Sequence, residues 1–168
     1  MSMGKIDKML ADLVSVGKKK GLPTPCSIKL DKKTYYMFTN GIIILLDTDP
    51  HECLYCKNEK IPAGDKKISK VISIMNEADE KAFYIMPEKS KAHDILMIHA
   101  PGSKTAKADI TLVKQAITFT GSNDVFYNLD HALEYDDGVY RGVDKFVSKD
   151  KSRIAFVLPI AKPKEEEE

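Results

Sequence analysis

Asn40 and Gly41 separate two β-prone runs, and this dipeptide limits the folds open to the chain more than any other feature of the sequence. Both residues tolerate a positive φ, which a tight turn between antiparallel strands requires. A third β-prone run precedes them across a short polar turn. The three runs are residues 26–30, 34–39 and 41–46. We therefore predict a three-stranded antiparallel meander in this part of the chain.

Amphipathic helices are predicted on both sides of the meander. Apolar residues recur at helical spacing over residues 4–16, while lysines and aspartates take the opposite side of that helix. The same spacing predicts a second helix over residues 67–80. Further strands are predicted over residues 82–86, 95–100, 109–120, 139–147 and 153–160, with a short helix around residues 129–133. This order of elements indicates an α+β fold.

Size and composition indicate one globular domain. The chain has 168 residues, of which 43% are hydrophobic and 30% are charged, and a chain of this length buries enough surface for a packed core. We predict a single domain over residues 1–161, with a Cys/His-containing loop at residues 47–67. The acidic tail at residues 162–168 is expected to be solvated.

The location predicted for the protein is the cytoplasm. The first residues, MSMGKIDKML, lack the apolar stretch of a signal peptide, and three cysteines cannot all pair within one chain. The longest apolar run, residues 41–46, has the length of a strand and not the roughly 20 residues of a membrane helix. We therefore expect no membrane partner.

The loop at residues 47–67 contains the pattern H-x-C-x-x-C. Two thiolates at this spacing and a nearby histidine can bind zinc, so His51, Cys53 and Cys56 are candidate metal ligands. A fourth ligand would have to come from elsewhere. The candidates are Cys26, His93, His99 and His131. Ordinary loop chemistry and a redox-active dithiol are alternatives, and no cofactor other than zinc is predicted.

No assembled catalytic motif is present in the sequence. It lacks a P-loop, a G-x-G-x-x-G fingerprint, a nucleophile elbow and an H-E-x-x-H motif. The pairs Ser90 with His93 and Asp130 with His131 have no context that indicates an activated nucleophile, and His99 fits a half-buried strand histidine. We therefore predict no catalytic residues and a protein that is not an enzyme. A hydrolase built around His99 or His131 is a third hypothesis.

Lysines cluster on and after the first predicted helix. They are Lys5, Lys8, Lys18, Lys19 and Lys20. The formal net charge is only +1, so any attraction to nucleic acid must come from local clusters of this kind. These lysines can contact a phosphate backbone in a non-specific, salt-sensitive manner. A solvated helix face is the alternative, because cations also favour the C-terminal end of a helix.

The order of elements and two short motifs resemble one domain of the bacterial DNA polymerase sliding clamp. In that family an amphipathic helix leads into three antiparallel strands with a Thr-Asp-Gly segment, and the domain closes with a short helix, strands and an apolar-Met-Pro-apolar ending. The matching segments here are KIDKMLADLVSV, SIKL, TYYMFTNGIIIL, FYNLDHALEY and IAFVLPI. Thr39, Asn40 and Gly41 occupy the Thr-Asp-Gly position, and Leu158, Pro159 and Ile160 occupy the Met-Pro position, with Asn and Leu in place of Asp and Met.

The resemblance implies a DNA-clamp-like α+β fold in which antiparallel sheets carry two amphipathic helices on one side. It further implies a non-enzymatic protein of bacterial or phage DNA replication, with lysine-bearing helices facing DNA. An apolar pocket at residues 39–41 and 158–160 would receive peptides from replication proteins. A ring around DNA would require a homo-oligomer, because this chain has room for one such domain. The alternative is a zinc-stabilised protein-interaction domain organised by His51, Cys53 and Cys56.

Overall fold

Helices and antiparallel strands alternate along the chain. The computed structural model describes residues 4–51, 61–77, 80–89, 94–100, 104–127, 133–134, 140–141 and 143–158. The helices in these residues are α1 (Lys5–Lys19), α2 (Lys66–Met75) and α3 (Ile110–Thr120). The strands are β1 (Cys26–Leu30), β2 (Lys33–Thr39), β3 (Ile43–Asp47), β4 (Glu80–Lys89), β5 (Asp94–Ala100), β6 (Lys104–Asp109), β7 (Val125–Tyr127), β8 (Leu133–Glu134), β9 (Tyr140–Arg141), β10 (Asp144–Val147) and β11 (Arg153–Val157).

Nine of these strands form one continuous hydrogen-bonded order, β1-β2-β3-β11-β10-β7-β4-β5-β6. Every pairing in that order is antiparallel, and β8 pairs separately with β9. Within that order Ile43 of β3 lies opposite Val157 of β11. The predicted three-stranded meander and the α+β class are therefore confirmed.

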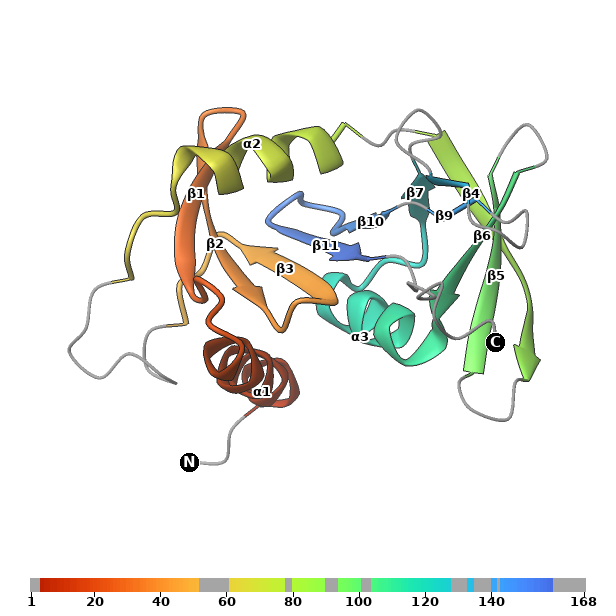
Figure 1. Ribbon diagram of the computed structural model, residues 1–168, viewed down its shortest axis with the longest axis horizontal. Helices are drawn as coiled ribbons and strands as arrows, with labels where there is room; N and C mark the ends of the chain where they lie inside the picture. The colour runs from red at the N-terminus through yellow and green to blue at the C-terminus, as the bar shows by residue number, and fades with distance from the viewer. Residues whose placement is uncertain are drawn as a thin grey trace, which may run out of the picture.

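Helices cover both faces of the β1-β2-β3-β11-β10 part of the sheet (Figure 1). The alternation of side chains along β3 divides the core into two clusters. Ile43 and Leu45 join the cluster beneath α1 and α3, whereas Leu46 joins the cluster beneath α2. Because both faces are buried, β3 is apolar at every position before Asp47 and lacks the alternation of polar and apolar residues that a half-exposed strand shows.

The topology repeats about the boundary between β3 and β11. In one half α1 is followed by β1, β2 and β3. In the other α3 is followed by β7 and, after the separate pair β8 and β9, by β10 and β11, so that β3 and β11 meet between the two halves. Both helices are followed by a glycine in the left-handed region, Gly21 with φ 76° and Gly121 with φ 71°. Such a residue ends a helix without the steric cost that a Cβ would bring. Each half is thus one helix packed on three antiparallel strands.

Two sequence predictions on α3 and its surroundings are wrong. Residues 109–120 form the end of β6 and then α3, not a strand. The buried residues Leu112, Val113, Ala116 and Phe119 follow helical spacing. The short helix predicted around residues 129–133 is contradicted at its end, because Leu133 belongs to β8, while residues 128–132 lie outside the described part of the chain. The second helix on the α1 side of the sheet is therefore α3 and not the segment FYNLDHALEY.

Candidate nucleic-acid interface and apolar pocket

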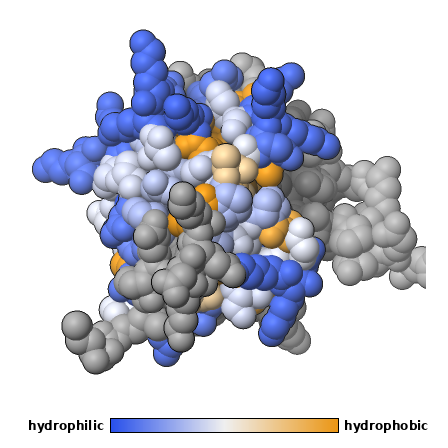
Figure 2. Space-filling model, turned by 90° about the vertical axis from the view of Figure 1, so that its left-hand side faces the viewer, coloured by the Kyte–Doolittle hydropathy of each residue, from blue (hydrophilic) through white to orange (hydrophobic). Residues whose placement is uncertain are grey.

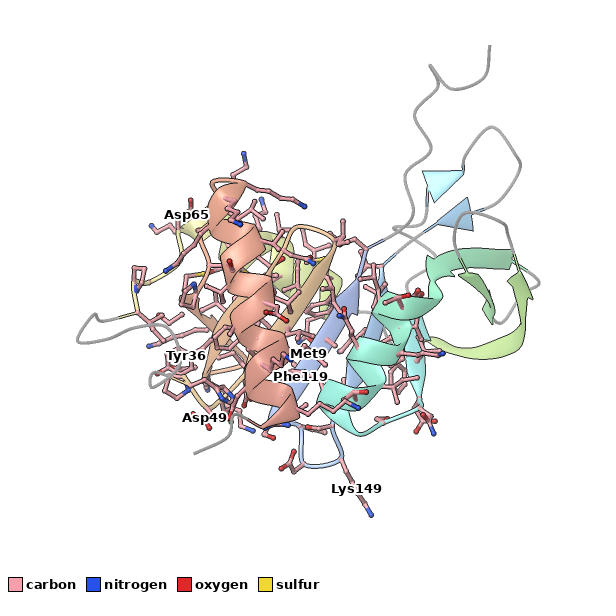
Figure 3. The ribbon with its side chains drawn as sticks, turned by 90° about the horizontal axis from the view of Figure 1, so that it is seen from below. Met9, Tyr36, Asp49, Asp65, Phe119 and Lys149 are labelled. Atoms are coloured by element: carbon pink, nitrogen blue, oxygen red, sulfur yellow. The ribbon has the colours of Figure 1, made fainter. Side chains whose placement is uncertain are left out.

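A groove of about 500 Å³ lies between α1 and α3. The two helices lie beside each other on one face of the sheet, and Met9 of α1 and Phe119 of α3 lie between them (Figure 3). The groove is lined by Lys5, Lys8, Met9, Asp12, Leu13, Val16, Asn40, Thr111, Lys114, Gln115 and Thr118. Its inner surface is apolar, and its charged groups come from both helices.

The charged lining of the α1–α3 groove is mainly cationic. Three exposed lysines, Lys5, Lys8 and Lys114, are accompanied by one aspartate, Asp12. Threonine hydroxyls and the Gln115 amide line the same groove and can donate hydrogen bonds. Lysines together with neutral donors are the groups that contact phosphate oxygens in a manner independent of base sequence. The groove therefore has the chemistry of a site for a phosphate backbone.

The structure places the five lysines nominated from the sequence at two ends of α1. Lys5 and Lys8 line the groove, whereas Lys18 and Lys19 are exposed in the last helical turn, roughly 15–20 Å away at the helical rise per residue. The Nζ atom of Lys20 donates to the Asn40 carbonyl oxygen at 2.9 Å, which gives this lysine a structural contact at the end of α1.

Lys114 is a groove residue that the sequence analysis missed. The sequence predicts a strand over residues 109–120, and in a strand position 114 has no relation to α1. The helical spacing of the apolar residues in ITLVKQAITF, with a glycine just after the helix, is the signal that identifies α3. On a helix beside α1, Lys114 comes to the same groove as Lys5 and Lys8.

The Thr39-Asn40-Gly41 segment is a turn fixed by its own side chains. Thr39 Oγ1 donates to the Ile43 carbonyl oxygen at 2.7 Å and accepts from the Gly41 amide at 3.0 Å. Asn40 Oδ1 accepts from the amides of Ile42 and Ile43 at 3.0 and 3.2 Å, and Gly41 has φ 99°. These contacts explain the residue types of the segment through turn formation alone.

An apolar pocket of about 290 Å³ opens beside this turn, on the side of α2. It is lined by Leu22, Pro23, Met37, Thr39, Gly41, Ile44, Lys67, Ile68, Val71 and Ile72. Two of the predicted pocket residues, Thr39 and Gly41, are part of it, while Asn40 lines the α1–α3 groove instead. The turn at residues 39–41 therefore separates the groove from the pocket.

The second predicted pocket segment reaches the same corner of the sheet. The Leu158 amide donates to the Ile42 carbonyl oxygen at 3.1 Å, so the end of β11 and the turn before β3 are neighbours. Leu158 does not line the apolar pocket, and Pro159 and Ile160 lie outside the described residues. The walls contributed by α2 were not nominated from the sequence, because nothing in its pattern indicates which sheet edge that helix covers.

Large apolar side chains are exposed on the surface around the pocket. Val71 and Ile42 are each 48% exposed, which is high for large apolar side chains. On the side of the molecule that carries α1 and β1, hydrophobic residues come to the surface between groups of hydrophilic ones (Figure 2). The only charged residue that lines the pocket within the described part of the chain is Lys67.

A third cluster of functional groups surrounds His51. Its Nδ1 atom lies 3.0 Å from Asp7 Oδ1 of α1, and its Nε2 atom lies 2.8 Å from Asp47 Oδ2 at the end of β3. The hydrogen bond with Asp47 raises the pKa of His51, although burial acts in the opposite direction. Arg153 Nε donates to the same Asp47 oxygen at 3.1 Å, and its Nη1 donates to the Phe119 carbonyl oxygen at 3.2 Å. The cluster joins α1, β3, β11 and the end of α3.

The contacts of His51 and the burial of Cys26 disfavour both residues as ligands of the predicted zinc site. Both ring nitrogens of His51 are directed at carboxylates, so neither is open to a metal ion here. Cys26, a candidate fourth ligand, is 1% exposed, and burial followed by the charge of Asp65 raises its pKa to about 11, which disfavours the thiolate that zinc requires. Over the described residues, no group of three or more His, Cys, Asp or Glu side chains could hold a metal.

The remaining metal and catalytic candidates cannot be placed in any site. Cys53, Cys56, Ser90, His93, Asp130 and His131 lie outside the described residues. His99 is in β5, where only the backbone is described. Zinc binding by Cys53 and Cys56 stays a prediction, as does the third hypothesis of a hydrolase.

Comparisons with family models, with curated proteins and with solved structures found no match for this chain. The relation to sliding clamps therefore stays a resemblance based on the residues quoted above. Within the described residues, no helix combines the length and the apolar character needed to cross a bilayer.

Proposed function

We propose that this chain is a non-enzymatic, clamp-like binding protein associated with DNA replication, and that it contacts the phosphate backbone of duplex DNA through the α1–α3 groove. The observation that carries the proposal is the placement of Lys5, Lys8 and Lys114 from two helices on one groove. The two helices occupy corresponding positions in the two halves of the fold. A resemblance to sliding clamps, in which such helices face DNA, supports the same assignment.

The expected contact with DNA is independent of sequence. Lysine offers a point charge and lacks the planar fork with which arginine recognises guanine, and none of the described residues that line the groove is an arginine. Each phosphate neutralised releases counterions, so three lysines give a slope of about −3 in a plot of log affinity against log salt. Fluorescence anisotropy of a labelled duplex across a salt series tests the proposal.

We further propose that the apolar pocket beside α2 binds short peptides with large apolar side chains. The specific observation in favour is its lining, in which the described residues are apolar apart from Thr39 and Lys67. Thr39 and Gly41 of the turn border the pocket, and so does Val71 of α2, which is 48% exposed and leaves this wall accessible to a partner. Peptides from replication proteins are the partners that the resemblance implies.

A further inference from the structure

The β1 strand is the last strand at one end of the sheet, so one side of its backbone faces away from β2. In an antiparallel pair the N–H and C=O groups of one residue point to the same side, and successive residues alternate. The backbone N–H and C=O groups of Ser27 are both bonded outside the β1-β2 ladder. The backbone groups of Ser27 and Lys29 therefore face away from β2, and we call these two the outward residues of β1. An open edge of this kind is a site for pairing with another chain.

A short segment just before α2 covers part of this edge. The Ser27 amide donates to the Pro62 carbonyl oxygen at 2.9 Å, and the Gly64 amide donates to the Ser27 carbonyl oxygen at 2.8 Å. Ala63 forms a parallel bridge with Ser27. We call residues 61–65 the strap. The strap bonds both outward backbone groups of Ser27, and Lys29 is the other outward residue of β1.

The strap does not itself continue the sheet. Its groups at Pro62 and Gly64 point toward β1, so those of Ala63 point away from it. The contact with β1 is a single isolated bridge between Ser27 and Ala63, and the strap ends at Asp65, whose carbonyl oxygen accepts from the Ser69 amide of α2. While the strap is closed, the outward groups of Ser27 are therefore not open to a further chain.

The strap is held at its C-terminal end by α2. Asp65 Oδ1 accepts from the Ile68 amide at 2.8 Å and caps the helix, and Ile72 of α2 is 2% exposed against the sheet. Close contact fixes the middle of the strap. A Cβ added at Gly64 would lie 3.2 Å from Cys26 Sγ, 3.2 Å from Ile28 Cγ2 and 3.3 Å from the Ser27 carbonyl oxygen, so only glycine fits without displacement.

We propose that the strap covers a self-association surface, the outer edge of β1. When the strap moves away, β1 of a second copy of the chain pairs with this edge. Two identical strands can pair about a twofold axis without any other partner. With Ile28 opposite its counterpart, Ser27 of one copy lies opposite Lys29 of the other. That register uses all outward groups of both strands and does not place the two Lys29 side chains opposite each other.

Hydrogen exchange of the unaltered protein provides the first test. The amides of Ser27 and Gly64 should exchange at least about tenfold more slowly than that of Lys29, because only the first two are bonded to their partner across the strap contact. Equal rates at Ser27 and Lys29 would show that the strap is not closed in solution. Protection of Lys29 in the unaltered protein would show that β1 is already paired with another chain. Either result overturns the proposal.

A pair of variants provides the second test. Gly64→Val places side-chain atoms where three neighbours already lie and should release the strap, with faster exchange at Ser27 in dilute samples. At higher protein concentration sedimentation should show a dimer, together with protection of the Lys29 amide. The matched control adds Ser27→Pro, which removes the outward donor of β1 but no bond to β2, and should return the protein to the sedimentation of the unaltered chain.

The results that contradict the proposal are distinct. A Gly64→Val protein that folds, loses protection at Ser27 and shows no concentration-dependent association would mean that the exposed edge does not bind a second copy. A dimer that persists after Ser27→Pro would place the contact elsewhere. Should Gly64→Val fail to fold, the exchange pattern of the unaltered protein still decides whether the strap closes β1. None of these outcomes depends on DNA binding.

Discussion

His51 Nε2 lies 2.8 Å from Asp47 Oδ2, and this contact joins the chain after β3 to the buried end of that strand. Asp47 is 2% exposed, so its carboxylate needs partners inside the protein. His51 and Arg153 supply them, and the other ring nitrogen of His51 reaches Asp7 of α1. An imidazole that donates to two carboxylates carries both of its protons.

Replacing His51 with alanine is expected to lower the free energy of unfolding by about 1.5–3 kcal/mol, the range for hydrogen bonds to charged groups. The loss should depend on pH. Since the pKa of His51 is raised in the folded state, its stabilising contribution is complete below the unfolded value of about 6.5 and is lost as the pH rises through the folded value.

Urea denaturation of His51→Ala and the unaltered protein at about pH 6 and about pH 9 measures this difference. Thr48→Ala is a suitable control, because Thr48 is an exposed neighbour whose backbone amide donates to the Ser152 carbonyl oxygen at 3.1 Å, a bond that the substitution leaves in place. An equal loss of stability at both pH values would show that His51 contributes as a neutral side chain and not as an imidazolium.

Gly17 marks the closest approach of α1 to the sheet. A Cβ there would overlap the Thr39 carbonyl oxygen and Thr24 Cγ2, although alanine is the better helix former by about 0.5–1 kcal/mol. Gly17→Ala should therefore destabilise the protein by about 1–3 kcal/mol in spite of its helix propensity. Thermal unfolding checks this, with Ser15→Ala on the exposed side of α1 as control. A Gly17→Ala protein as stable as the control would contradict the close approach.

A substitution at Val71 tests whether the apolar pocket binds peptides. Val71→Glu places a carboxylate on the wall of the pocket and should weaken binding of a labelled hexapeptide with two adjacent leucines by at least about tenfold, since a buried charge costs more than 1.4 kcal/mol. Ser73→Glu adds the same charge to an exposed position of α2 and should leave binding unchanged. If both variants bind the peptide as the unaltered protein does, the peptide uses another surface. If the unaltered protein binds no such peptide, the pocket is not a peptide site.

Local patterns in the sequence predict the elements near the N-terminus well. The Asn-Gly turn and the apolar spacing of the first helix depend on residues close in sequence, and both are found. The first helix was predicted to end before Gly17 but continues to Lys19. Its glycine serves a contact with Thr39, which is remote in sequence, and does not end the helix.

Predictions that depend on burial were less successful. The run at residues 109–120 is apolar enough to suit a buried strand or a buried helix, and its place on the sheet beside α1, which agrees with the helical spacing of its apolar residues, decides for the helix. For the same reason Lys114 was missed as a groove residue and α2 as a wall of the pocket. His51 was nominated as a metal ligand from its neighbours in sequence, whereas its partners Asp7 and Asp47 come from two separate elements.

The most direct measurement is the salt dependence of duplex DNA binding by the unaltered chain and two charge-matched variants. Lys5→Gln/Lys8→Gln/Lys114→Gln removes the three groove lysines, and Lys66→Gln/Lys67→Gln/Lys70→Gln removes three lysines of α2 on the opposite face of the sheet. We predict weaker binding and a slope smaller by about 0.9 per lysine for the first variant only. Equal losses in both variants, or binding by the unaltered chain that does not depend on salt, would contradict the assignment of the α1–α3 groove to DNA.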